Sequence, residues 1–166
     1  MKVRTLVVAL LILVSAGCSS KETATDKSSH AAETLQAQEC AACGMIVRDQ
    51  PAPRGQLVHR DGTRLFFCSV SDMLTYLEAP SPHGKAVALF VESMDRIADP
   101  IIHNTEAGPW IDATHSSYVV GFEKEVMGDP ILAYTTSAQA QAQASRLSAK
   151  ALTWTELQAW SAQRGP

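Results

Sequence analysis

The stretch Gln56-Leu57-Val58-His59-Arg60-Asp61-Gly62-Thr63-Arg64-Leu65-Phe66-Phe67-Cys68 carries the clearest fold signal in this sequence. Two runs rich in β-branched and aromatic residues flank a central Asp-Gly, and this arrangement is a strong signal of a β-hairpin. Ser69, with Asp72 three residues later, predicts the start of a helix that the prolines near residue 80 end. Residues 86–91 are then an apolar run of strand length, so the predicted order is strand, strand, helix, strand.

The second half of the chain repeats these element types without a residue-level repeat. Strands are expected at residues 110–113, 117–121 and 131–134. An Ala/Gln-rich stretch from about 137 to 150 has high helix propensity and few large apolar residues, so it predicts a largely exposed helix. A short strand near residues 150–152 and a last helix capped by Thr153 and Glu156 follow. The predicted class is α+β, with antiparallel sheet dominating.

A sulfur motif, Glu39-Cys40-Ala41-Ala42-Cys43-Gly44-Met45, precedes this region. Thiolates and thioethers are soft ligands that favour Cu(I) over harder ions. Gly44 allows a sharp bend, so that the Cys43 and Met45 sulfurs can turn toward one point. The spacing alone also fits a redox pair, half of a zinc site or a disulfide.

The surrounding sequence weakens the other interpretations of Cys40 and Cys43. A thioredoxin-type pair begins a helix within a βαβ pattern, whereas polar residues precede Cys40, and Gly44 disfavours a helix. A structural zinc site needs four ligands, and the chain has no second Cys-x-x-Cys. Attachment of a c-type haem would need a histidine after Cys43.

Other potential ligands are scattered along the chain. Met127 lies in a second turn marked by glycine and proline, and such loops commonly carry function. Met73 and Met94 are expected in the core, and Cys68 is expected to be a small buried hydrophobe at a strand end. The histidines at 59, 103 and 115 are expected to be surface or hydrogen-bonded residues.

The N-terminus predicts export. A basic start, a short apolar run and small residues make up residues 1–17, which is the pattern of a signal peptide. This segment ends on Cys18, so a lipoprotein signal and lipidation of Cys18 are expected, although Ser15 stands where such signals usually have leucine. Residues 18–38 are small and polar and predict a flexible tether, and residues 39–166 form the predicted domain. The formal net charge of −3 argues against a nucleic-acid partner.

Several blocks of sequence together resemble the NosL family, lipoprotein accessory factors for nitrous-oxide reductase maturation. They cover about residues 39–160 in this order: 40–45 (Cys-Ala-Ala-Cys-Gly-Met), Gln56 with 61–62 (Asp-Gly), 67–73 (Phe-Cys-Ser-Val-Ser-Asp-Met), 94–95 (Met-Asp), 110–113 (Trp-Ile-Asp-Ala), 118–121 (Tyr-Val-Val-Gly) and 127–128 (Met-Gly). The residues just before Met127 are more acidic than the family pattern would suggest.

The resemblance implies a fold of two ββαβ-like units packed into one compact unit, and a Cu(I) chaperone rather than an enzyme. By its blocks, the implied ligands are Cys43, Met45 and Met127, and Cys40 also matches in position. The implied partners are nitrous-oxide reductase and an ABC-type membrane complex of the same pathway. The implied location is the periplasm, held to a membrane by lipid. The outer membrane is favoured because no aspartate follows Cys18.

The resemblance, together with the soft ligands of the sulfur motif, therefore implies a periplasmic Cu(I) chaperone that delivers copper for the copper–sulfur cluster of the reductase. The alternative is a thiol–disulfide oxidoreductase that uses Cys40 and Cys43 to keep copper-site thiols reduced.

Overall fold

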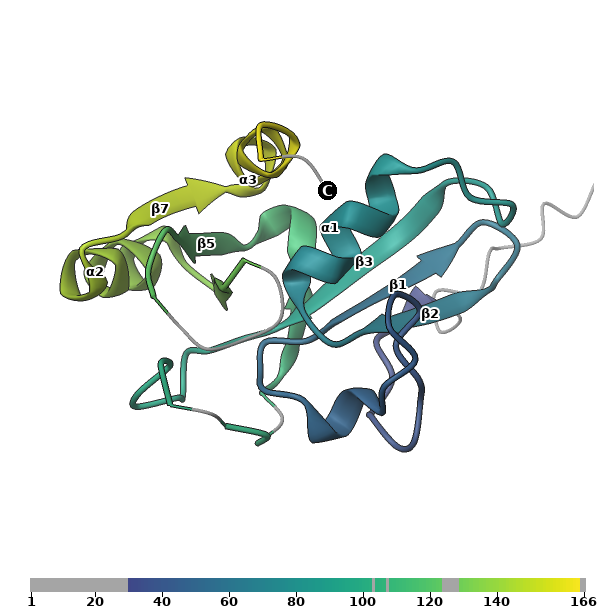
Figure 1. The fold of residues 1–166 in the computed structure, drawn as a ribbon, viewed down its shortest axis with the longest axis horizontal. Coiled ribbons are helices and arrows are strands. Elements are labelled where there is room, and N and C mark those ends of the chain that lie inside the picture. The colour runs from purple at the N-terminus through teal and green to yellow at the C-terminus, as the bar shows by residue number, and fades with distance from the viewer. Residues whose placement is uncertain (1–29, 103, 107, 124–128, 165–166) are drawn as a thin grey trace, which may run out of the picture.

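The computed structural model describes residues 30–102, 104–106, 108–123 and 129–164. In this part of the chain, two antiparallel sheets and three α-helices pack into one α+β unit (Figure 1). The helices within it are all too short or too polar to cross a membrane.

The first unit forms where the sequence predicts the hairpin. Strands β1 (Gly55–His59) and β2 (Arg64–Phe67) pair antiparallel, and Gly62 takes the positive φ that the tight turn needs. Helix α1 (Val70–Glu78) follows, with the Ser69 hydroxyl accepting the Asp72 N–H at 3.0 Å as its N-cap. Strand β3 (Ala86–Glu92) then pairs with the other side of β1, which gives the order β2-β1-β3.

Strand β4 (Trp110–Asp112) corrects one prediction. The sequence placed it in the second half, but it pairs with β3 and so extends the first sheet to β2-β1-β3-β4. The pairing is long-range, and local pattern does not show which sheet a three-residue strand joins.

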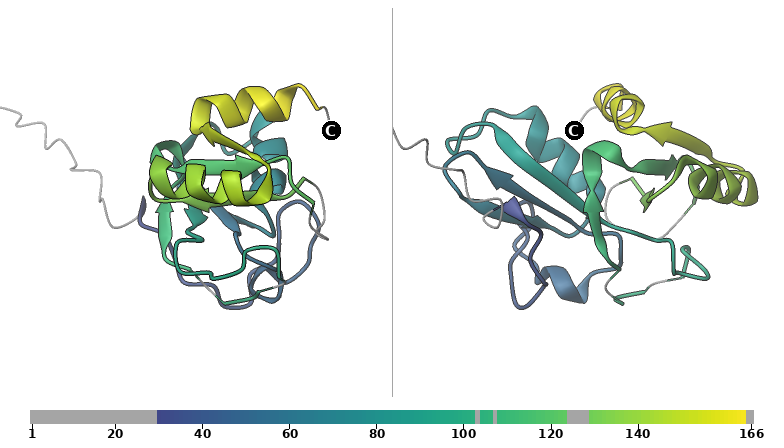
Figure 2. Two further views of the ribbon diagram at one scale, coloured as in Figure 1. Left: turned by 90° about the vertical axis from the view of Figure 1, so that its left-hand side faces the viewer. Right: turned by 180° about the vertical axis from the view of Figure 1, so that it is seen from behind.

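The second unit repeats the topology of the first. Strands β5 (Ser117–Val120), β6 (Ile131–Tyr134) and β7 (Lys150–Thr153) form a sheet in the order β6-β5-β7, and helix α2 (Ser137–Leu147) connects β6 to β7. Helix α3 (Trp154–Ala162) starts with the predicted capping box of Thr153 and Glu156. In Figure 2, α2 lies at the outer end of this unit, away from α1, whereas α3 lies near α1.

The two units share one hydrophobic core. It combines side chains of both sheets with those of α1 and α3. Its largest buried members include Leu57, Phe67, Met73, Tyr118 and Leu157. Because each sheet is apolar on the face that meets the other unit, neither ββαβ unit could bury its core alone.

A buried ion pair fixes the loop between the 3-10 helix at Val47–Asp49 and β1. Arg54 and Glu92 are 1% and 0% exposed, and the Arg54 Nε and Nη2 donate to the Glu92 carboxylate at 2.5 and 2.9 Å. Arg54 Nη1 also donates to the carbonyls of Arg48 and Gln50 at 2.8 and 3.2 Å. The guanidinium thus holds the loop against β3.

Part of the predicted tether contacts the first sheet. The Gln56 side chain, buried on β1, accepts the Glu33 N–H and donates to the Glu33 carbonyl, both at 3.0 Å. Arg64 of β2 forms an ion pair with the Glu33 carboxylate at 2.9 Å. The chain is therefore held to the sheet several residues before the sulfur motif.

Candidate metal centre

The sulfur motif folds into a tight turn. The Gly44 N–H donates to the Cys40 carbonyl, and the Cys40 N–H donates to the Met45 carbonyl, both at 2.8 Å. Gly44 has φ +75°, a conformation that side-chain-bearing residues rarely adopt, so the glycine is required by the turn. Cys43 consequently lies exposed at the turn, while Cys40 is buried at its base.

Backbone pairing fixes this turn beside the end of β2. The Ala41 N–H donates to the Phe66 carbonyl at 2.9 Å, and Cys40 forms a parallel bridge with Phe66. Cys68 comes two residues after Phe66, between the end of β2 and the N-cap of α1. The pairing therefore brings a third cysteine to the turn.

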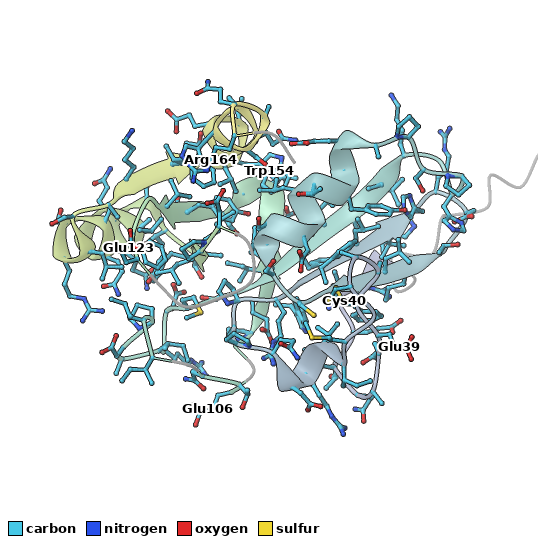
Figure 3. The ribbon with its side chains drawn as sticks, viewed as in Figure 1. Glu39, Cys40, Glu106, Glu123, Trp154 and Arg164 are labelled. Carbon is cyan, nitrogen blue, oxygen red and sulfur yellow. The ribbon has the colours of Figure 1, made fainter. Side chains whose placement is uncertain are left out.

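Three thiols and one carboxylate converge at this point, and Figure 3 labels one of these residues, Cys40. The ligand atoms of Cys40, Cys43, Cys68 and Asp72 all lie within 4.8 Å of one another. The Cys43 and Cys68 Sγ atoms are 3.6 Å apart, and the Cys40 Sγ is 4.0 Å from the Asp72 carboxylate. All three cysteines are free thiols. A donor set dominated by sulfur suits a soft or borderline ion such as Cu(I) or Zn(II).

The surroundings shift the pKa values of Cys40 and Cys68 in opposite directions. Burial acts to raise the pKa of Cys40, but hydrogen bonds from backbone N–H groups, led by that of Cys68 at 3.3 Å, lower it below its ordinary value. Burial raises the pKa of Cys68, and the adjoining thiols raise it further. Burial also raises the pKa of Asp72, against hydrogen bonds with Ser69. The group thus combines one thiol whose pKa is lowered, Cys40, with one whose pKa is raised, Cys68.

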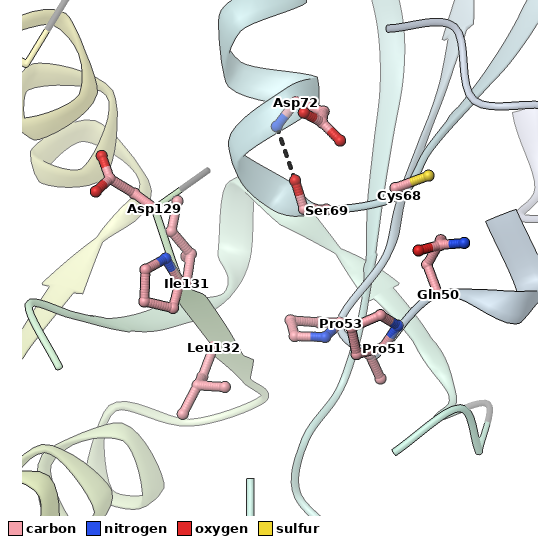
Figure 4. Close-up of a pocket in the computed structure, with 11 residues that line it drawn as sticks. Gln50, Pro51, Pro53, Cys68, Ser69, Asp72, Asp129, Ile131 and Leu132 are labelled. Carbon is pink, nitrogen blue, oxygen red and sulfur yellow. Dashed lines mark hydrogen bonds between the residues drawn. The ribbon is translucent and has the colours of Figure 1, made fainter. Parts of the chain in front are cut away.

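A pocket of about 50 Å³ is lined by one of the three thiols, Cys68. In Figure 4, Cys68, Ser69 and Asp72 form one wall, and Asp129, Ile131 and Leu132 of the second unit lie across from them. Gln50, Pro51 and Pro53, in the loop that Arg54 holds, also line the pocket. The candidate metal centre therefore borders the junction of the two units.

Comparisons with known proteins agree with this architecture. The NosL family model matches residues 31–161. The chain belongs to the NosL family. It is 32% identical over 154 residues to a copper-binding lipoprotein NosL of Stutzerimonas stutzeri, covering 92% of this chain and 78% of the relative. The crystal structure of the copper chaperone NosL from Shewanella denitrificans shares its fold, with a TM-score of 0.63 and 23% identity, over 76% of this chain and 95% of that one. These relatives are named as copper-binding proteins, not as enzymes.

Three of the four sequence-predicted ligands of this NosL-family chain lie in the described residues, whereas Met127 and the predicted lipidation site Cys18 do not. Cys40 and Cys43 both belong to the sulfur cluster. Met45 is partly buried and packs against the small apolar cluster that contains Cys40 and Cys68. Met127 and Cys18 lie outside the described residues.

Sequence reasoning missed Cys68 as a member of the centre. It is buried, as expected, at 5% exposure, but its sulfur faces Cys43 rather than only apolar neighbours. One signal pointed to it: if Cys18 carries lipid, three thiols remain, and an odd number outside the cytoplasm suggests a free or metal-bound thiol.

The described histidines of the NosL-family chain do not join the centre. His59 is buried and bonded through its two ring nitrogens to the Gly84 carbonyl and the Tyr76 hydroxyl, at 2.8 and 3.0 Å. His115 is exposed beside Asp112. Met73 and Met94 are buried in the core, as predicted.

Proposed function

We propose that this NosL-family chain is a Cu(I) chaperone that delivers copper for assembly of the copper–sulfur cluster of nitrous-oxide reductase. The observation that carries the proposal is the convergence of three free thiols at one partly exposed point. The printed names of its relatives, a copper-binding lipoprotein and a copper chaperone, support the same metal.

The proposed ligands are Cys43, Met45 and Met127, with Cys40 as an additional sulfur. Cys43 is exposed, which suits exchange of an ion with a partner, and Met45 packs against the cysteine cluster. Support for Met127 comes from Asp129, two residues further along the chain, which lines the same pocket as Cys68. Thioether ligands suit Cu(I) and provide a set of neutral donors beside the thiolates.

The proposed location is the periplasm, with the chain anchored to a membrane through lipid on Cys18. The absence of aspartate after Cys18 favours the outer membrane. A polar tether between the anchor and the sheet contact at Ala31, whose carbonyl accepts from Arg64 of β2, would let the domain reach its partners. The proposed partners are the reductase and an ABC-type membrane complex. Mass spectrometry of membrane-extracted protein should find acylated Cys18, and a soluble chain with a different N-terminus would contradict the anchor.

An anaerobic Cu(I) titration against a chromophoric chelator tests the function. The chain should bind copper, and Met127→Ala should weaken binding. Met94→Leu is the matched control, because it removes a thioether from the core while nearly conserving volume. Copper should then pass from the loaded chain to copper-free reductase. Failure of the parent protein to compete with the chelator would refute the chaperone proposal, and binding without transfer would refute the partner.

A further inference from the structure

We infer that Cys68 is itself a metal ligand, and that Cys43 and Cys68 form a two-thiolate site for a soft monovalent ion at the start of α1. This inference rests on the proposed copper function and adds to it a ligand that lies outside the Cys-x-x-Cys-Gly-Met motif. It concerns the described residues Cys40, Cys43, Cys68 and Asp72 and does not depend on Met127.

The sulfur separation is that of two ligands on one ion. With metal–thiolate bonds of about 2.3 Å, the 3.6 Å between the Cys43 and Cys68 Sγ atoms corresponds to an angle of roughly 100° at the ion. Three-coordinate geometry needs a separation only a few tenths of an ångström larger. A small movement of the exposed Cys43 would provide this, because the turn carries Cys43 at its outer end.

The backbone around Cys68 is fixed, unlike that of a loop ligand. Cys68 directly follows the last residue of β2 and immediately precedes Ser69, whose side chain caps α1. Strand pairing on one side and a helix cap on the other leave little freedom to the Cys68 sulfur. Cys68 is therefore suited to hold an ion, and the exposed Cys43 is suited to receive and release it.

Cys40 links the two ligands. Its Sγ accepts the Cys68 N–H at 3.3 Å, and its own backbone closes the turn that carries Cys43. This contact joins the base of the turn to the point where β2 meets α1. Cys40 thereby positions Cys43 opposite Cys68 before any ion arrives, which lowers the cost of assembling the site.

An ion can reach Cys68 through the pocket at the junction between the two units. Cys68 and Asp72 line it together, so Cys68 is not enclosed by apolar side chains alone. A core thiol with no further role would be expected to have hydrophobic neighbours on every side. The placement of Cys68 between a thiol partner and a pocket is what distinguishes a ligand from a packing residue.

The test compares Cu(I) affinities of Cys68→Ser and Cys68→Val by anaerobic chelator competition. Serine keeps the size of the thiol, and valine keeps the apolar packing against Phe66 and Val47, so the two variants make different demands on the fold. Val47→Ala is the control, since it disturbs the same small cluster without removing a donor. Melting curves of the metal-free variants identify those that fold, and thiolate-to-copper absorption in the near ultraviolet reports sulfur ligation directly.

Loss of a ligand should lower affinity by at least about tenfold in each folded Cys68 variant and reduce the charge-transfer absorption per bound ion. Val47→Ala should keep both the affinity, within about threefold, and the absorption. Unchanged affinity and absorption in a folded Cys68 variant would overturn the inference while leaving the chaperone function intact. A parent chain that binds no copper would instead overturn the proposed function and this inference with it.

Discussion

Replacing Arg54 with methionine should destabilise the metal-free protein by about 3–5 kcal/mol, the usual cost of removing one partner from a buried ion pair. Arg54 and Glu92 are 1% and 0% exposed, so the carboxylate left behind can reach no water. The upper end of the range is expected. Besides its two bonds to Glu92, Arg54 donates to the carbonyls of Arg48 and Gln50. Each buried acceptor left without a donor adds a further penalty.

Urea unfolding of the metal-free protein measures this change. Because domains of this size are stable by about 5–15 kcal/mol, the loss would be a large fraction of the total. Arg48→Met is the matched control: its ion pair with Asp49 is largely exposed, and such pairs contribute about 0–1 kcal/mol.

A double variant separates the charge penalty from lost packing. Glu92→Met in the Arg54→Met background removes the uncompensated charge and should recover part of the stability. The reasoning is refuted if Arg54→Met costs less than about 1 kcal/mol, within the range of an exposed pair. It is also refuted if the double variant is no more stable than Arg54→Met, because the buried charge would then contribute nothing.

Three predictions concern the thiols. Cys43→Ser should lower Cu(I) affinity while changing the free energy of unfolding by no more than about 0.5 kcal/mol, because Cys43 is exposed; melting curves and chelator competition measure the two effects. Burial raises the pKa of Cys68, so that thiol is protonated at neutral pH and a bound ion must displace its proton. Copper affinity measured from pH 6 to 8.5 should therefore rise with pH, and an affinity that does not change with pH would contradict this. Mild oxidation by a disulfide donor should join Cys43 to Cys68, because their sulfurs are 3.6 Å apart; peptide mass spectrometry would instead show Cys40 joined to Cys43 if the Cys-x-x-Cys were a redox pair.

Local signals in the sequence predicted most elements of the fold. The Asp-Gly turn, the Ser69 cap and the capping box of Thr153 all act within a few residues, so their chemistry is visible in a short window. The second helix was expected to be largely exposed, and only its small residues Ala140 and Ala144 are buried. The sheet to which β4 belongs could not be predicted in this way, because it depends on pairing with a distant strand.

The cysteine cluster was predicted only in part, because one of its three thiols joins it through long-range contacts. Cys40 and Cys43 stand in one motif, so their soft-ligand chemistry could be read directly. Cys68 joins them only through contacts across 25 residues or more, including the bond from its own N–H to the Cys40 sulfur. Contacts between residues so far apart produce no local pattern in the sequence from which they could be predicted.

The alternation of side chains along β2 would nevertheless have indicated where the Cys68 sulfur lies. Side chains alternate across a sheet, so Phe66 and Cys68 point to one face and Phe67 to the other. Phe67 belongs to the main core, whereas Phe66 and Cys68 belong to the small cluster with Cys40. Once the turn is known to pair with β2 at Phe66, alternation places the Cys68 sulfur on the side where Cys43 lies. The deciding information is thus a single parallel bridge between Cys40 and Phe66, which shows that Cys68, expected from the sequence to be a small buried hydrophobe, belongs to the candidate metal centre.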